Sequence, residues 1–276
     1  MKRAIYLLTG VGLLGSTLLF AAIGAGLIYS LARAGVEIIP AVFSLTWNPA
    51  QGAYGLLPMI SSSLLVALAA LFLSLPLGFG LLWSIWVYDN AFSLFLRNLL
   101  RFMAGIPTVV YGLCGLFLLV PLMRDMGAGN GFSLASVALV LSILILPSLV
   151  LTIDSAIYSL MKRPENITLT AGALGLGRDK AFLYIALKAC RRQIAAGAVL
   201  AFGRALGDTL IALMISGNAP VMPDGLFSSL RVLPAHINLL SAVEIDANIE
   251  FTLFLSGFML MAAAVGMSLF SRVLQK

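Results

Sequence analysis

Residues 202–218 read FGRALGDTLIALMISGN, an apolar stretch with two opposite charges inside it. Arg204 and Asp208 are four residues apart, so on a continuous helix they lie one above the other on one face and can form an ion pair. A charge near the bilayer centre costs at least about 2.5–3.5 kcal/mol and usually faces a bundle interior or an aqueous path. The pair therefore indicates either a lock between helices or a route for a charged solute.

The rest of the chain has the composition of an integral membrane protein. Hydrophobic residues make up 61% of its 276 residues and charged residues only 10%, against about 25% charged in soluble domains. Apolar runs long enough to cross a bilayer recur from end to end without the alternation of a β-barrel. We expect an all-α membrane protein with a single transmembrane domain over residues 1–276, whose six helices span about 4–31, 60–86, 100–123, 134–158, 194–216 and 251–269.

The basic residues predict the orientation of these spans. Thirteen of the 17 Lys and Arg residues lie in segments that are predicted on the same side of the membrane as the amino terminus. Loops rich in Lys and Arg stay in the cytoplasm. We therefore expect both termini to be cytoplasmic. The net charge of +6 follows from the same bias and requires no nucleic-acid partner.

The segment of about 161–193, between the fourth and fifth spans, is too polar to cross a membrane and too long for a tight turn. It is patterned as short amphipathic helices broken at Gly175 and Gly177, with Phe182 on the apolar face. Such a surface binds either the membrane interface or a partner protein. No phosphate-binding loop motif occurs, so any ATP must bind to another chain. We expect no catalytic residues and no metal site, since His236 has no companions at ligand spacing.

Two interpretations of the charges in the fifth span stay open. In the structural one, Arg204 and Asp208 form a buried ion pair, and Gly203 and Gly207 allow close helix packing. In the functional one, Arg204 offers its planar fork of donors to a passing anion, and Asp208 positions it. Asp208 accepts hydrogen bonds only, so it tolerates an oxyanion that still carries a proton, as phosphate does, and repels sulfate.

Three segments resemble the membrane subunits of bacterial phosphate-uptake ABC transporters, the PstC/PstA permease family, and PstC most closely. They are GRALGDTLIALMISGN (Gly203 to Asn218), AGIPTVVYGLCGLFLLVP (Ala104 to Pro121) and the WNP at Trp47. The resemblance implies the six-helix core of a type I ABC importer in the bacterial inner membrane, with a cytoplasmic coupling helix between helices 4 and 5. It also implies a sister permease, two ATPase subunits that hold the ATP and magnesium, and a periplasmic or lipid-anchored phosphate-binding protein.

By this resemblance, residues of about 169–188 form the coupling loop seated on the ATPase. The contacts would come from Leu169, Thr170, Ala171, Leu174, Gly175, Gly177 and Phe182. The chain departs from the family at three positions: Leu169 stands where Glu is usual, Lys188 where Pro is usual, and Asp208 where Glu is usual. The alternatives are an importer of another oxyanion, such as sulfate, molybdate or tungstate, and a non-transporting membrane scaffold or sensor.

Overall fold

The computed structural model describes residues 2–88, 90–161, 172–173, 175–242 and 246–275, and these are mostly helical. The longer helices are α1 (Lys2–Ala34), α3 (Leu57–Val87), α4 (Ala91–Ala104), α7 (Leu134–Met161), α11 (Arg191–Leu206) and α14 (Ala247–Gln275). The short helical elements are α2 (Ile38–Val42), η1 (Pro49–Gln51), α5 (Thr108–Cys114), η2 (Gly115–Leu119), α6 (Val120–Asp125), α9 (Arg178–Lys180), η3 (Ala181–Ala186), α10 (Leu187–Ala189), α12 (Leu210–Ile215) and α13 (Leu233–Leu240). Two short antiparallel strands, β1 (Trp47–Asn48) and β2 (Ala53–Tyr54), form a hairpin.

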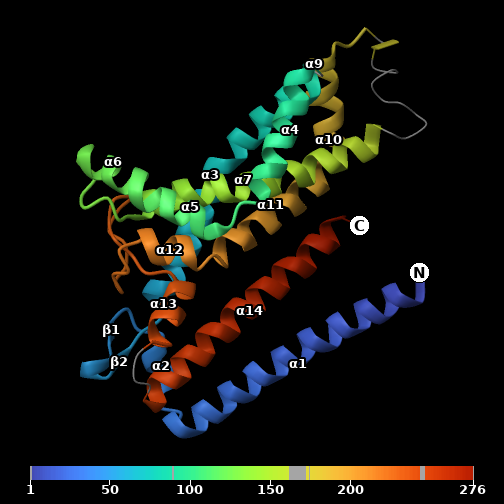
Figure 1. Cartoon of the computed structure of the whole chain (residues 1–276). Coiled ribbons are helices and arrows are strands. Elements are labelled where there is room, and N and C mark those ends of the chain that lie inside the picture. The colour runs from blue at the N-terminus through green and yellow to red at the C-terminus, as the bar shows by residue number, and fades with distance from the viewer. Residues whose placement is uncertain (1, 89, 162–171, 174, 243–245, 276) are drawn as a thin grey trace.

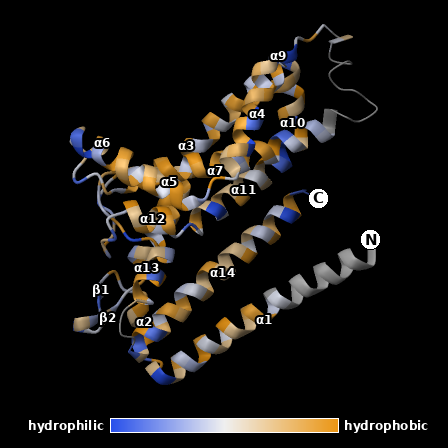
Figure 2. Cartoon of the chain, in the orientation of Figure 1, coloured by the Kyte–Doolittle hydropathy of each residue, from blue (hydrophilic) through white to orange (hydrophobic). Residues whose placement is uncertain are grey.

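Within the described residues, five helical segments are long and apolar enough to cross a membrane, against the six that the sequence predicts. The third begins at Thr108 and not near residue 100, because Asn90 starts a separate amphipathic helix, α4, by accepting hydrogen bonds from two backbone N–H groups. The predicted fifth span, 194–216, is divided into α11 and α12. Figure 2 shows the apolar character of α3 and α7.

Helix α7 lies at the centre of the bundle, packed against α3, α4 and α11. Its apolar window is 72% buried, whereas the windows of α1 and α14 are each 6% buried, so these two terminal helices lie at the edge (Figure 1). Arg97 of α4 donates to both carboxylate oxygens of Asp154 on α7, at 3.3 and 3.2 Å. This pair ties α4 to the central helix.

The two ends of the bundle carry different structures. In Figure 1, α9, α10 and both chain termini lie toward one end of the long helices, and the β-hairpin, α2 and α13 lie toward the other, which we call the hairpin end. At the hairpin end, Arg33 pairs with Glu250 at 2.8 Å, and the Tyr54 hydroxyl donates to Asp246 at 3.3 Å. These contacts join the end of α1 and the hairpin to the start of α14.

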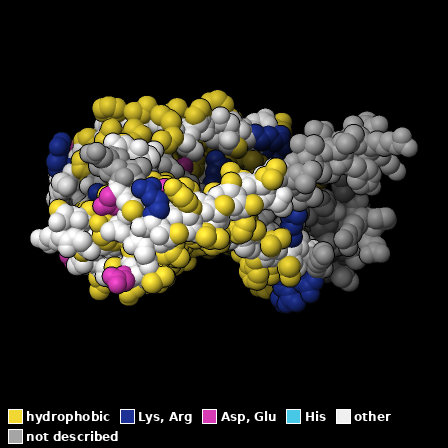
Figure 3. Space-filling model, turned by 90° about the horizontal axis from the view of Figure 1, so that it is seen from below, with side chains coloured by type: hydrophobic (Ala, Val, Ile, Leu, Met, Phe, Trp, Pro, Cys, Tyr) yellow, Lys and Arg dark blue, Asp and Glu magenta, His cyan; other side chains and the backbone are white. Residues whose placement is uncertain are grey.

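Much of the outer surface is apolar. In the view of Figure 3, hydrophobic side chains spread across the face, and charged groups are few and scattered. Large side chains such as Phe72 and Phe117 are 78% and 69% exposed. A surface of this kind is matched to lipid or to other membrane helices, because it would be unfavourable in water.

Candidate anion site at a broken helix

The stretch that holds Arg204 and Asp208 is a broken helix. Helix α11 ends at Leu206, and the N–H of Gly207 closes its last turn on the carbonyl of Gly203 at 3.1 Å. Asp208 and Thr209 then lie outside regular helix, and α12 begins at Leu210. Unwound backbone at membrane depth is tolerated only where protein or a water-filled cavity surrounds it. The break therefore belongs to the protein interior or to a transport path.

The ion pair that the sequence spacing allows between Arg204 and Asp208 is not formed in the structure, so the structural interpretation of these charges is wrong on this point. Across the described ranges, salt bridges join Arg33 with Glu250 and Arg97 with Asp154, and neither charge of the break takes part. The Asp208 carboxylate instead accepts the N–H of Ile211 at 2.9 Å and so caps the start of α12. Because the helix stops at Gly207, the one-face spacing of residues four apart no longer holds.

Arg204 is half-buried and has no carboxylate within salt-bridge distance in the part of the chain that the structure describes. It still interacts electrostatically with Asp208, and with Tyr111 of the neighbouring α5. A guanidinium has five N–H donors in a planar fork, which matches an oxyanion. Arg204 thus places a half-buried cation at the break, with no salt-bridge partner among the described residues. The part of the functional interpretation in which Asp208 holds the guanidinium is not seen, and contact of Arg204 with an anion stays a prediction.

A second break lies beside the first. Helix α4 ends at Ala104, Pro107 precedes α5, and the Tyr111 hydroxyl donates to the carbonyl of Met103 at 2.9 Å, across the break. Helices α5 and α12 then pack closely: a Cβ on Gly112 would lie 2.7 Å from the sulfur of Met214.

Sequence reasoning missed this pairing of the half-helices and the part of Tyr111 in it. Gly115, one turn after Gly112, also lies close to α12, because an added Cβ there would lie 3.2 Å from the Ile215 Cδ1. The Gly112 to Gly115 spacing was the available signal.

Two spaces adjoin the first break. A tightly closed space, lined by Ser63, Leu141 and Val232 among others, lies next to Asp208. On another side, an open groove of about 460 Å³ is lined by Gly207 and Thr209 of the break and by residues of α13 and α14, including Asn238 and Met261. The groove gives the broken backbone access to a space that could hold solute or a neighbouring helix.

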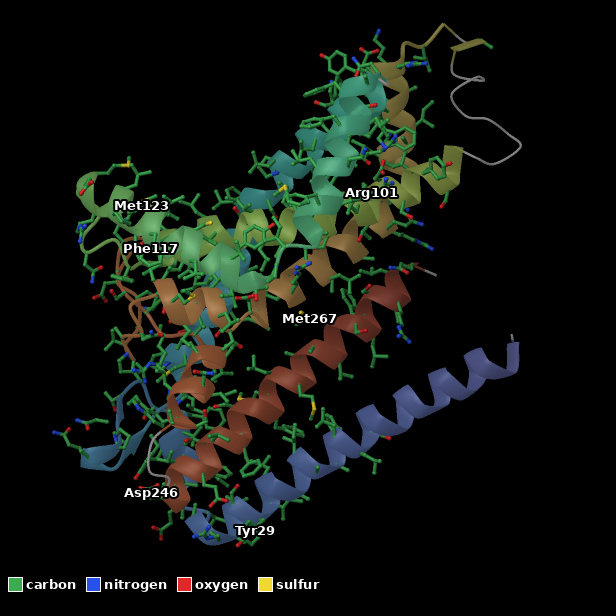
Figure 4. All side chains as sticks on the ribbon, viewed as in Figure 1. Tyr29, Arg101, Phe117, Met123, Asp246 and Met267 are labelled. Carbon is green, nitrogen blue, oxygen red and sulfur yellow. The ribbon has the colours of Figure 1, made fainter. Side chains whose placement is uncertain are left out.

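The two glycines of the predicted packing motif have different surroundings. A Cβ on Gly203 would lie 3.3 Å from the sulfur of Met267, which Figure 4 shows on the side of α14 that faces α11. Gly207 is exposed, and the contact nearest to its added Cβ is the Gly203 carbonyl at 3.4 Å. The packing role of both glycines stays a prediction.

Part of the predicted coupling loop can be placed. Leu169, Thr170, Ala171 and Leu174 lie outside the described residues. Gly175 has a φ of +76°, which favours glycine, and Gly177 precedes α9 in an extended conformation.

Phe182, in η3 beyond α9, is 3% exposed and packs edge-on against Trp83 of α3, with ring centroids 6.0 Å apart. Its neighbours Leu183 and Tyr184 are 42% and 66% exposed. The segment is therefore anchored to the bundle by one face and presents another.

Fold and site together define a class of protein. Interrupted membrane helices that meet around a charged group are typical of proteins that move solutes across membranes. The chain is a multi-pass helical membrane protein with this architecture.

Comparison with known proteins names the family. The chain is 32% identical to the probable ABC transporter permease protein YqgH of Bacillus subtilis over 209 residues, which cover 74% of this chain and 67% of the relative. It is 28% identical to the phosphate transport system permease protein PstC of Pasteurella multocida, over 66% of this chain and 62% of the relative. It is 29% identical to the probable PstC of Methanocaldococcus jannaschii, over 69% and 65%. No family model matches the chain.

The chain therefore belongs to the ABC transporter permeases and resembles the PstC group within them. The PstC relatives are the longer proteins, since the matched part of this chain spans 62% and 65% of their lengths.

Proposed function

We propose that this chain is the membrane-spanning subunit of an ATP-driven importer that carries inorganic phosphate across the bacterial inner membrane. The observation that carries the proposal is Arg204, a half-buried guanidinium with no carboxylate within salt-bridge distance among the described residues, at the break between α11 and α12. Leaving such a cation without a counter-charge in a membrane protein costs free energy, and a passing oxyanion would recover it. The printed names of the PstC relatives supply the substrate.

Asp208 takes a revised role in this proposal. Its hydrogen bond to the Ile211 N–H fixes the first turn of α12, so it positions this half-helix and does not hold the guanidinium. Its negative charge still lies near Arg204, and we retain the prediction that it favours an anion that carries a proton over one that does not.

The proposed orientation places α9, α10 and both termini in the cytoplasm and the hairpin end outside. The basic residues favour this orientation, because Lys and Arg concentrate in the segments that would be inside. In this arrangement Arg204 reaches the anion after it has entered from the hairpin end. The path would be completed by a sister permease, since α14 and α1 leave apolar surface free at the edge of the bundle.

ATP binding and hydrolysis would occur on two partner ATPase subunits, which hold the magnesium as well. The support within this chain is the segment around Phe182: it is anchored on Trp83 while Leu183 and Tyr184 remain exposed at the proposed cytoplasmic end. A docked ATPase would cover these apolar side chains and push on α3 through the Phe182 ring. A phosphate-binding protein would dock at the hairpin end.

An importer of another oxyanion is the second candidate. Arg204 offers the same donors to sulfate, molybdate or tungstate, so the guanidinium by itself does not select among them. Competition among anions separates this candidate from a phosphate importer, and a scaffold or sensor would move no anion at all.

The test is uptake of radiolabelled phosphate by vesicles that contain this chain with its co-purifying partners. We expect uptake to require ATP, to resist sulfate and molybdate, and to fall about tenfold or more in Arg204→Ala, since a charge-assisted hydrogen bond is worth about 1.5–3 kcal/mol. Arg101→Ala is the matched control, because Arg101 is exposed on α4 (Figure 4). Full uptake by an assembled Arg204→Ala complex would make Arg204 a structural charge, and no uptake by the wild type would overturn phosphate as substrate.

A further inference from the structure

The burial and pairing of the arginines single out a second cation. Among the described residues, three arginines are half-buried: Arg97, Arg204 and Arg231. Arg97 is paired with Asp154. Neither Arg204 nor Arg231 has a carboxylate within salt-bridge distance in the described ranges, and the two lie near opposite ends of α12. Half-buried arginines usually have a counter-charge, so both of these require an explanation.

Arg231 is held in a defined position. Its Nε donates to the carbonyl of Asn218 at 2.8 Å. Asn218 ends the turn after α12 in the left-handed conformation, with a φ of +53°, and its side-chain amide donates to the carbonyl of Leu213 at 2.8 Å. The N–H of Leu230, next to Arg231, donates to the carbonyl of Ser216 at 3.0 Å. The guanidinium is therefore fixed through Nε, and the described residues give its two Nη groups no acceptor.

The surroundings of Arg231 favour an anionic ligand. Burial lowers the pKa of Arg231, which shows that its cation is poorly solvated, yet arginine stays charged at any physiological pH. His236, which interacts with Arg231, is kept neutral by burial and adds no competing charge. A desolvated, preoriented pair of N–H groups is the geometry that binds an oxyanion through two parallel hydrogen bonds.

We propose that Arg231 is a second contact for the transported oxyanion, at the outer end of α12, and that the anion passes from Arg231 to Arg204 along this helix. With six residues, α12 is about 9 Å long, a distance that a small anion covers in one or two steps. The inference rests on the proposed function, because it takes phosphate as the cargo and the hairpin end as the outside. Asn218 is then a positioning residue that aims the guanidinium.

A purely structural role makes a different prediction. Arg231 would then only hold the turn after α12, a role for which Nε and the Asn218 carbonyl suffice. Loss of that contact would lower complex assembly and ATP hydrolysis together with uptake. Loss of an anion contact would lower uptake and leave assembly and ATP hydrolysis in place.

The experiment measures phosphate uptake, ATP hydrolysis and melting temperature on the same vesicle-reconstituted complex. We expect Arg231→Gln to lower uptake about tenfold or more, the effect of losing one charge-assisted contact, and to change ATP hydrolysis by less than about twofold. Arg124→Gln is the control, because it removes an exposed cation from α6 at the same end. Wild-type uptake is measured first, so failure of the proposed function shows itself separately, and it overturns this inference too.

A charge-rescue arm tests Arg231 directly. Cys114 is exposed and Cys190 buried, so both are replaced by alanine before Arg231→Cys is introduced. A trimethylammonium thiol reagent restores the positive charge and should recover part of the uptake, whereas a sulfonate reagent should not. Equal results from the two reagents, or a parallel fall of uptake, ATP hydrolysis and stability in Arg231→Gln, would overturn the proposal. A phospholipid headgroup offers the same chemistry; if it is the ligand, Arg231→Gln will lose stabilisation by anionic lipid but keep its uptake, which also overturns it.

Discussion

His236 should make the stability of this protein fall in mild acid. The side chain lies on α13, outside the candidate spans, and is fully buried; neither ring nitrogen has a hydrogen-bond partner within the described part of the chain. Its ring packs edge-on against Trp47, with centroids 4.3 Å apart. Burial, with a smaller effect from the Arg231 cation, lowers the pKa of His236 to about 3 from the usual 6.5. The folded protein therefore holds the neutral imidazole.

The sign of the effect follows from proton binding. Between the two pKa values the unfolded chain binds a proton at His236 and the folded chain does not, so the free energy of unfolding falls as the pH drops below 6.5 and stops falling near 3. At pH 5 the loss is about 2 kcal/mol, since each pKa unit is worth about 1.4 kcal/mol. For a chain of this size that corresponds to about 4–8 °C in melting temperature.

The assay is the melting temperature of the purified protein in detergent from pH 7.5 to 5, for wild type and His236→Asn. Asparagine does not titrate in this range, so the variant should show a flatter curve, although it starts from a lower stability. Arg231→Gln should also flatten the curve, because it removes a positive charge that opposes protonation of His236. Parallel curves for wild type and His236→Asn would refute the reasoning and locate the acid sensitivity elsewhere.

Three further predictions address the half-helices, the anchor and the cap. Gly112→Val should lower stability by about 1–3 kcal/mol, because the side chain would force α5 away from Met214; thermal melting checks this, with Gly80→Ala, which meets nothing within 4 Å, as the control. Phe182→Ala should lower the free energy of unfolding by about 3–5 kcal/mol, or release the segment around residue 182 from α3. Release would be measured as ATP hydrolysis without uptake, and uptake that stays coupled to ATP hydrolysis in the variant would count against the anchor. Asp208→Asn keeps the helix cap and removes the charge, so sulfate should compete better with phosphate for uptake. Unchanged competition by sulfate would show that Asp208 does not discriminate between the two anions.

The long apolar helices could be predicted from the sequence because length and hydropathy alone determine them. The ends of α3 and α7 lie within about three residues of the predicted spans, because polar residues follow both apolar runs and a glycine-rich segment precedes α7. The prediction fails where hydropathy does not change at a helix end. The residues before and after Pro107 are mostly apolar, so the sequence prediction places the junction of α4 and α5 inside one span.

The candidate site could be located from the sequence but its geometry could not. Arg204 stands out because a charge in an apolar run is expensive. The break that follows it depends on which hydrogen bond Asp208 makes, and both a side-chain ion pair and a backbone cap are compatible with its spacing. The order glycine, aspartate, threonine at 207–209 is a helix end followed by a helix start, which was the local signal for the second choice. Arg231 lies in a loop, where nothing in the sequence indicates that it is half-buried.

The break and the lack of a salt bridge to Arg204 among the described residues have one physical cause. If α11 continued through Gly207, Asp208 would lie one turn from Arg204 and would neutralise it, and a passing anion would have to displace that carboxylate. With the helix broken, the Asp208 carboxylate satisfies the Ile211 N–H, a donor that the start of α12 would otherwise leave free. The guanidinium thus remains available without a buried carboxylate left unsatisfied. The proposed phosphate importer needs that balance, because a cation that is already paired attracts an anion only weakly.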